Sequence, residues 1–312
     1  MEQSEIEKKG FSLIFKSVKD IAQQTAEEID RLYFESLQEK DSISGIPTGF
    51  IDIDKVTDGL PDGINVLGGR PECGLTDFAL NVALNASENY KVTYFTPGIP
   101  AEVLMKRLVF MKSLFSPQNI KNKVAVPQRD LPKIGASLEK LADRPINFYD
   151  SPLDPETFYE ACRSIQDREK KQLIVLDRFQ SLFIKRKNFK NKINLSQREI
   201  SGIFHELADE KGLAILVLSE VKKYEGKIST NYLRDFGILE YIAKPIILFE
   251  NYGNCDYESD FFREDAVPIS VRIANNILGG AITAECHLTY LKSYGRFENA
   301  SKISTDDIPN ED

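Results

Sequence analysis

Short apolar runs alternate with segments of helical periodicity from about residue 45 to residue 291. Unbroken apolar strands that alternate with helices are typical of a parallel sheet covered on both faces, so the expected fold class is α/β. The last two strands follow each other with no helix between them, which predicts an antiparallel edge. Helical spacing covers residues 78–85, 101–114 and 196–210. The expected strands span residues 64–67, 91–95, 146–149, 173–176, 213–218, 246–249, 269–273 and 286–291.

Residues 1–45 are polar and acidic, but they contain one apolar stripe at helical spacing. A stripe of this kind predicts an amphipathic helix that needs a partner surface. The helix can pack on its own domain or dock on a neighbouring subunit. The acidic residues 299–312 predict a frayed tail. The stripe consists of Ile14, Val18, Ile21, Thr25, Ile29 and Leu32.

The composition of the 312 residues is globular, with 42% hydrophobic residues and a net charge of −8. This acidity argues against a protein that coats nucleic acid by bulk charge, although it leaves room for a local basic groove. The four cysteines have no CxxC or zinc spacing, which favours a reducing cytoplasm, and two histidines exclude multi-histidine metal sites. No apolar run approaches 18 residues, so no membrane span is expected.

Residues 69–76, Gly-Arg-Pro-Glu-Cys-Gly-Leu-Thr, lie between an expected strand and an expected helix. A phosphate-binding loop has the pattern GxxxxGK[ST] in this setting. Gly69, Gly74 and Thr76 are in register with that pattern, whereas Leu75 takes the place of the lysine. Inward-facing amides and a helix N-terminus favour an anion, and the Thr76 hydroxyl can ligate magnesium. A plain glycine turn would explain the segment equally well.

Taken together, these blocks resemble the C-terminal, RecA-like motor domain of DnaB-type replicative helicases. The resemblance runs from about residue 10 to residue 299, and its most specific block is GIPTGFIDIDKVTDGLPDG, residues 45–63. It implies a mostly parallel sheet covered by helices on both faces. The implied organisation is a linker-type helix over 1–44, a RecA-like domain over 45–299 and a disordered tail over 300–312, with the family's N-terminal domain absent. The further blocks are residues 68–85, 92–108, 147–165, 173–183, 197–221, 233–249 and 296–299.

The resemblance also implies which positions carry ATP hydrolysis, and several of them have changed. By position, Leu75 replaces the phosphate-binding lysine, Gly98 the general base, Glu220 the sensor glutamine, and Asn275 and Ile277 the arginine-finger cations. We therefore expect a non-hydrolysing protein whose binding of ATP or ADP with magnesium is weak or lost. The resemblance assigns Asp177 and Thr76 to a magnesium ion. Asp177 could instead be a cap at the end of a strand, and Thr76 could be an ordinary hydroxyl in the first turn of a helix. The retained nucleotide positions are Gly69, Arg70, Gly74, Thr76, Asp177 and Gln180.

A basic run without acids follows the Asp177 strand, where loops of RecA-like rings contact single-stranded DNA. Lysine and arginine would neutralise phosphates there, and Phe189 would stack on a base. The alternatives are a solvated loop, or one that pairs with the acidic residues 250–265 of a neighbour. The candidate DNA-binding residues are Lys185, Arg186, Lys187, Phe189, Lys190, Lys192 and Arg198.

Three functions are compatible with these observations. The first is a binding protein of DNA replication that attaches to single-stranded DNA, to a helicase ring or to another primosome protein, or that forms a homo-oligomeric ring such as a hexamer. The second is an active ATP-dependent helicase with rearranged residues, in which Lys222 or Lys244 reaches the phosphates. The third is a RecA-like regulatory or scaffold protein of a mobile element.

Overall fold

The computed structural model separates the chain into two compact units, Met1–Ile43 and Ser44–Asp312, which are described one at a time. The residues that the structure describes are 6–8, 11–13, 17–19, 21–23, 25–27, 29–30, 43–116, 131–167, 170–183, 196–222, 228–233, 237–251, 266–275 and 282–300.

The first unit contains a short antiparallel pair and helical residues. Strand β1 (Ile6–Lys8) pairs with strand β2 (Phe11–Leu13), although both lie within the segment 1–44 that was expected to be a helix. The apolar stripe begins only at Ile14, and Gly10 between two short runs favours a turn. Residues 18–19, 21–23, 25–27 and 29–30 are helical, with exposed apolar side chains at Val18, Ile21 and Ile29.

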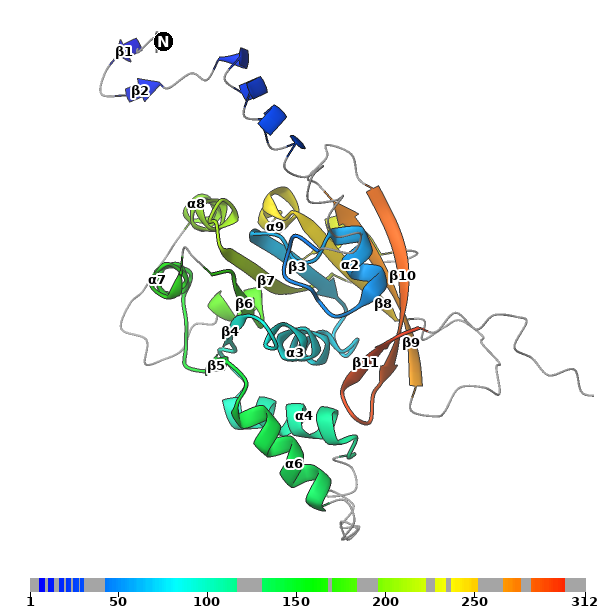
Figure 1. Ribbon diagram of the computed structural model, residues 1–312. Helices are drawn as coiled ribbons and strands as arrows, with labels where there is room; N and C mark the ends of the chain where they lie inside the picture. The colour runs from blue at the N-terminus through cyan, green and yellow to red at the C-terminus, as the bar shows by residue number, and fades with distance from the viewer. Residues whose placement is uncertain are drawn as a thin grey trace, which may run out of the picture. The chain divides into compact units, whose positions relative to one another are not determined.

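The second unit is built on a sheet of nine strands among the described residues, in the order β11-β10-β9-β8-β3-β7-β6-β4-β5 (Figure 1). The six strands from β8 to β5 run parallel, whereas β9, β10 and β11 continue the sheet with antiparallel pairings. The expected fold class and the antiparallel edge are thus confirmed, and the edge contains one more strand than expected. The strands are β3 (Gly63–Gly69), β4 (Lys91–Phe95), β5 (Ile146–Tyr149), β6 (Gln172–Leu176), β7 (Leu213–Glu220), β8 (Pro245–Asn251), β9 (Ala266–Asn275), β10 (Ile282–Leu291) and β11 (Arg296–Asn299).

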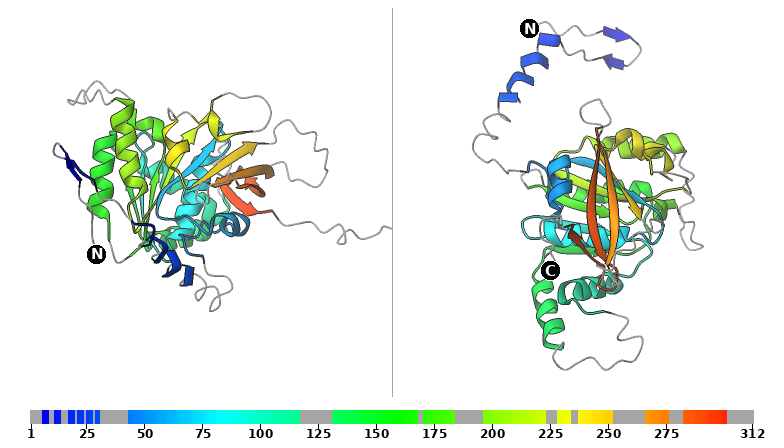
Figure 2. Two further views of the ribbon diagram at one scale, coloured as in Figure 1. Left: turned by 90° about the horizontal axis from the view of Figure 1, so that it is seen from above. Right: turned by 90° about the vertical axis from the view of Figure 1, so that its right-hand side faces the viewer.

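Helices cover both faces of this sheet, with α3 and α4 on one face and α7, α8 and α9 on the other (Figures 1 and 2). Helices α3, α4 and α8 match the predicted helical segments to within three residues at each end, whereas α2, α6, α7 and α9 were not predicted. The helices are α2 (Ile51–Thr57), α3 (Leu75–Ala86), α4 (Ala101–Ser113), α6 (Leu131–Ala142), α7 (Pro155–Ile165), α8 (Gln197–Ala208) and α9 (Ile238–Ile242), with 3-10 turns η1 (Phe179–Phe183) and η2 (Thr230–Tyr232).

The hydrophobic core has one layer on each side of the sheet, because successive side chains of a strand point to opposite faces. In β6, Leu173 and Val175 join the layer that contains Phe78 of α3. Ile174 and Leu176 join the layer that contains Phe204 of α8. Both faces of the central strands are therefore buried, which explains why these strands are mostly apolar. Among the described residues, no helix is both long enough and apolar enough to cross a membrane.

Candidate phosphate-binding site

The candidate site lies where three neighbouring strands end. Strand β7 lies between β3 and β6, and all three run parallel. Gly69, the last residue of β3, pairs with Glu220 at the end of β7, while Asp177 directly follows β6. The carboxyl ends of parallel strands form one edge of a sheet, where α/β proteins bind ligands. The structure therefore brings together the expected loop, the expected acid and the residue at the sensor position.

The loop between β3 and α3 ends in a glycine at the helix N-cap, but its lysine position is apolar. Gly74 is the N-cap of α3 and has φ 87°, a left-handed conformation that favours glycine. Leu75 is only 8% exposed and belongs to the core layer above the sheet. Its side chain therefore stabilises the loop by packing and offers no hydrogen bond to a phosphate. Burial raises the pKa of Cys73 to about 12, so this thiol stays protonated at neutral pH.

Asp177 is buried at the centre of the site, with hydrogen bonds from two hydroxyl groups. The hydroxyl of Tyr94 on β4 donates to its Oδ2 atom at 3.0 Å, and the side chain of Thr76 also hydrogen-bonds to the carboxylate. The Oδ1 atom is buried and has no hydrogen-bond partner. Burial raises the pKa of Asp177, and burial together with the nearby carboxylate raises the pKa of Tyr94. The sequence identified Asp177 and Thr76 but missed Tyr94, which is an ordinary aromatic residue in an apolar strand.

Asp177 and Thr76 provide oxygen ligands of the kind that Mg²⁺ prefers. The Oδ1 atom of Asp177, which accepts no hydrogen bond, is available for such an ion. Among the described residues, however, no group of three or more histidine, cysteine or acidic side chains could hold a metal ion. The two residues therefore fit a Mg²⁺ ion that arrives with the phosphates of a nucleotide, as Mg²⁺ commonly binds through one or two carboxylates and substrate oxygens.

An ion pair joins the ends of β6 and β7. The guanidinium Nη1 atom of Arg178 contacts the Oε1 atom of Glu220, and its Nε atom lies 3.9 Å from the Oδ1 atom of Asp177. Gln180 completes the cluster, because its Nε2 atom donates to the Ser219 hydroxyl at 3.0 Å. The sequence singled out Glu220 and Gln180 but missed Arg178, whose only signal was its place after Asp177.

A second polar cluster on α3 was not predicted. The Oδ1 atom of Asp77 accepts from Arg107 of α4 at 2.8 Å, and its Oδ2 atom accepts from the Tyr290 hydroxyl of β10 at 2.5 Å. The Tyr290 ring stacks on Phe297, with centroids 4.3 Å apart. Burial, followed by the Asp77 charge, raises the pKa of Tyr290. This cluster ties the first turn of α3 to two other elements and so fixes the position of the loop before it.

The other predicted site residues divide between the two edges of the sheet. Gly98 follows β4 and therefore lies at the same carboxyl edge as the loop, with β7 and β6 between β4 and β3, and it is exposed. Asn275 ends the antiparallel strand β9 opposite Pro245, the first residue of β8, so it lies at the opposite edge of the sheet. Lys244, one of the two lysines that the active-helicase alternative required near the phosphates, lies at that edge too, where its Nζ atom donates to the Asp62 carbonyl oxygen. Ile277 lies outside the described residues.

Most of the candidate DNA-binding residues also lie outside the part of the chain that the structure describes. Arg198 is the exception, and it is exposed in the first turn of α8. The Ser196 hydroxyl accepts from the Glu199 amide at 3.3 Å, and the Glu199 side chain bonds back to Ser196, which forms a capping box. The basic run therefore leads into a well-defined helix start. The remaining predicted residues are Lys185, Arg186, Lys187, Phe189, Lys190 and Lys192.

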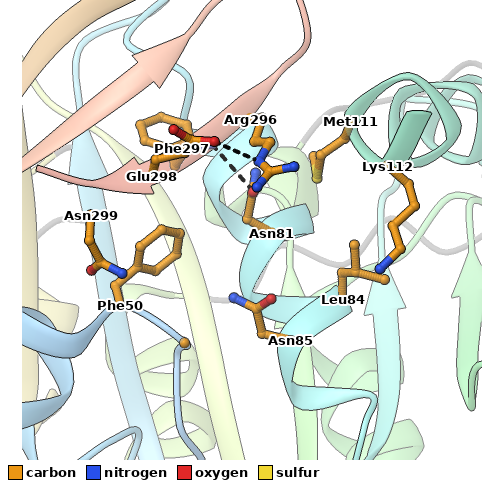
Figure 3. Close-up of a pocket in the computed structure, with 11 residues that line it drawn as sticks. Phe50, Asn81, Leu84, Asn85, Met111, Lys112, Arg296, Phe297, Glu298 and Asn299 are labelled. Atoms are coloured by element: carbon orange, nitrogen blue, oxygen red, sulfur yellow. Dashed lines mark hydrogen bonds and ion pairs between the residues drawn. The ribbon is translucent and has the colours of Figure 1, made fainter. Parts of the chain in front are cut away.

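A polar pocket of about 480 Å³ lies beside α3 (Figure 3). Asn81 and Asn85, one helical turn apart, line it together with Lys112 of α4 and the last strand, β11. Asn85 donates to the Thr48 carbonyl at 2.9 Å, and Asn299 accepts from the Ile51 amide at 3.0 Å. These bonds hold α2 against α3 and β11, so the pocket lies where three segments distant in sequence meet.

Replacing Asp177 with asparagine is expected to raise the free energy of unfolding at pH 7 by about 1–2 kcal/mol, because a buried charge is removed. The raised pKa means that the folded state holds the proton more tightly than the unfolded state. Stability conferred by the protonated acid is therefore lost as the pH rises from 3.8 through the folded pKa. Urea unfolding at pH 4 and pH 7 should show the variant's advantage growing with pH. Asp143→Asn, at an exposed position, is the control for the loss of one carboxylate.

Comparison with known proteins adds sequence and fold relationships to this geometry. Residues 45–299 match the family model of the DnaB-like helicase C terminal domain. The chain is 26% identical over 312 residues to the replicative DNA helicase DnaB of Geobacillus stearothermophilus, covering 96% of this chain and 65% of the relative. It is 24% identical over 300 residues to the replicative DNA helicase DnaC of Bacillus subtilis (strain 168), covering 92% of this chain and 63% of the relative. The chain thus spans less than two thirds of both relatives.

Two solved structures share the fold. One is an ATPase domain, which superposes with a TM-score of 0.74 at 23% identity, over 88% of this chain and 98% of that one. The other is a DnaB-like replicative helicase, described with its interactions with primase, which superposes with a TM-score of 0.75 at 23% identity, over 94% of this chain and 69% of that one. The RecA-like ATPase fold expected from the sequence is therefore confirmed.

Proposed function

Because the chain belongs to the family of DnaB-like helicase C-terminal domains, we propose that it serves DNA replication by binding, without sustained ATP hydrolysis. The observation that carries the proposal is the burial of Leu75 in the core at the position where a phosphate-binding loop has its lysine. The chain keeps the motor fold of the family, while the buried Leu75 takes the place of the lysine that would bind the terminal phosphates.

Two further positions support the loss of turnover. Gly98, at the position of the general base, has no side chain to activate water, and a lost base costs about 10²–10⁴ in rate. Asn275 and Ile277 stand in place of the arginine finger, which contributes about 10³–10⁵. These factors do not multiply cleanly, but either of them leaves little turnover. Asp177 and Thr76 would still support weak binding of ATP or ADP with magnesium.

The proposed partners are single-stranded DNA and the ring of a replicative helicase or another primosome protein. The basic run from Lys185 to Arg198 supports DNA binding, because clustered lysine and arginine side chains neutralise phosphates. The exposed apolar residues Val18, Ile21 and Ile29 on the helical segment of the first unit support docking on another subunit, including a homo-oligomeric ring. The domain boundaries 1–44, 45–299 and 300–312 are part of this proposal.

The proposal predicts no steady ATP turnover by the purified protein, with or without single-stranded DNA. The enzyme concentration is chosen so that the assay would detect a rate as low as about one turnover per hour. A coupled phosphate-release assay measures it. A Leu75→Lys, Gly98→Glu variant shows whether the missing groups alone account for the loss. Robust DNA-stimulated turnover by the wild-type protein would overturn the proposal in favour of an active helicase.

DNA binding is tested in the same preparation by fluorescence anisotropy with a labelled oligothymidine at several salt concentrations. Affinity that falls steeply with salt, and that weakens when Lys187 and Lys190 are replaced by glutamate, is the expected result. Replacing Lys55 and Lys112, which lie on α2 and α4, is the matched control for the change in net charge. Equal losses in both variants would contradict a DNA-binding role for the basic run.

A further inference from the structure

We propose that Arg178 is the phosphate-binding cation of this chain and that Glu220 competes with the phosphate for it. The inference rests on the proposed function in one respect, since it concerns the nucleotide site that the proposal leaves with weak binding. Neither residue has its partner nearby in the sequence, because one follows β6 and the other ends β7. Their pairing is visible only in the folded sheet.

The positions of the two residues relative to the loop are set by strand pairing. Glu220 pairs with Gly69, the first glycine of the loop, and the Val221 amide donates to the Gly69 carbonyl at 3.0 Å. Arg178 follows β6, and its guanidinium contacts the Glu220 carboxylate at the end of β7. Strand β7 lies between β6 and β3, so Glu220 is carried by the strand between the one that precedes Arg178 and the one that leads into the loop.

Arg178 is close enough to the metal-side residues to act on the same ligand. Its Nε atom is 3.9 Å from the Oδ1 atom of Asp177, the buried oxygen that has no hydrogen-bond partner. Burial raises the pKa of Cys73 in the loop, and the charge of Arg178 acts in the opposite direction. Arg178 is therefore within electrostatic range of the loop. A phosphate bound beside a magnesium ion at Asp177 would therefore lie within reach of the Arg178 guanidinium.

The chemistry of the pair favours exchange of one anion for another. A guanidinium binds a carboxylate or a phosphate through the same fork of N–H donors. The Arg178 side chain is 36% exposed and that of Glu220 is 22% exposed, so both can change partner without opening the core. With Glu220 in place, an incoming phosphate must displace a carboxylate and also remain beside its charge. Nucleotide affinity is therefore set by competition between the two anions.

The decisive experiment is a double-mutant cycle on nucleotide affinity, measured with a fluorescent ATP analogue and Mg²⁺ on the full chain. Glu220→Gln removes the competing charge and is expected to tighten binding about tenfold to hundredfold, the range of one charge-assisted hydrogen bond. Arg178→Gln in that background is expected to cancel the gain. Glu220→Asp, which keeps the charge on a shorter side chain, is expected to give a smaller gain.

Glu210→Gln is the matched control. Glu210 forms an ion pair with Arg163 at 3.7 Å and is 21% exposed, close to the exposure of Glu220, but it lies before the amino end of β7. It changes the net charge equally and leaves the loop edge untouched. Circular dichroism melting of each variant verifies that it is folded before affinities are compared.

Two outcomes would overturn the inference. A gain that persists in the Arg178→Gln, Glu220→Gln variant would mean that only repulsion was relieved and that Arg178 binds no phosphate. A gain in Glu220→Gln no larger than in Glu210→Gln would remove the role of Glu220. The proposed function has a separate readout, because wild-type ATP turnover would overturn it while leaving the coupling between Arg178 and Glu220 measurable.

Discussion

Replacing Phe78 with alanine is expected to lower the free energy of unfolding by about 3–5 kcal/mol. Phe78 is fully buried on α3, and its ring centroid lies 4.7 Å from those of Phe50 and Phe249 and 5.3 Å from that of Phe297. The three neighbouring rings come from the N-cap of α2, from β8 and from β11. The Phe78 side chain therefore contacts both the first helix and the last strand of the second unit. Truncation would remove contacts with three segments and leave a cavity among them.

Urea unfolding followed by circular dichroism measures this loss. Tyr241→Ala is the matched control, because Tyr241 is an aromatic residue on α9 that is 83% exposed. Substitutions at exposed positions usually change stability by less than about 0.5 kcal/mol. A loss at Phe78 below about 1 kcal/mol would contradict its role as the junction of these segments.

Replacing Gly63 with alanine is expected to cost about 2–5 kcal/mol, which is the sum of left-handed strain and a steric clash. Gly63 begins β3 with φ 94°, and a Cβ atom there would collide with the backbone carbonyl oxygen of Ala208 at the end of α8. A backbone atom cannot move aside as a side chain can. The strand that leads to the phosphate loop, or the end of α8, would have to shift.

Gly202→Ala gives the matched control with the opposite sign. Gly202 lies inside α8, and a Cβ atom there would meet nothing within 4 Å. Alanine is expected to stabilise this helix by about 0.5–1 kcal/mol. Thermal melting of both variants therefore should move the transition in opposite directions. Equal shifts would show that the backbone of Gly63 has room to relax.

The sequence was sufficient to predict the central parallel strands, because their burial on both faces leaves short, mostly apolar runs. It failed for α2, where Ile51 and Ile53 alternate with acids as they would in a strand. The helix forms because Asp54 is buried and its carboxylate accepts from the Thr48 amide at 2.8 Å and the Gly49 amide at 3.0 Å. Helix α7 had a local signal that was overlooked, since Asp154 accepts from the Thr157 amide at 2.8 Å ahead of Pro155.

At the candidate site, the sequence could identify residue types by their place in a motif but not the direction in which they point. The position of Leu75 was clear, whereas its burial depends on how α3 packs against the sheet. Asp177 was predicted as the acid at a strand end. Its contact with Tyr94 and the pairing of Arg178 with Glu220 depend on which strands are neighbours, and that order is a property of the whole chain.

The strand order also has a consequence for the way the chain acquires its fold during synthesis. Strand β3 pairs with Leu213–Glu220 and with Pro245–Asn251, each well over a hundred residues further along the chain. The nascent chain therefore exposes an apolar strand on both edges until most of the domain has left the ribosome. Such non-local pairing slows folding and favours aggregation. Strand β3, which leads into the candidate phosphate loop, is therefore the described strand of this sheet that waits longest for its pairing partners.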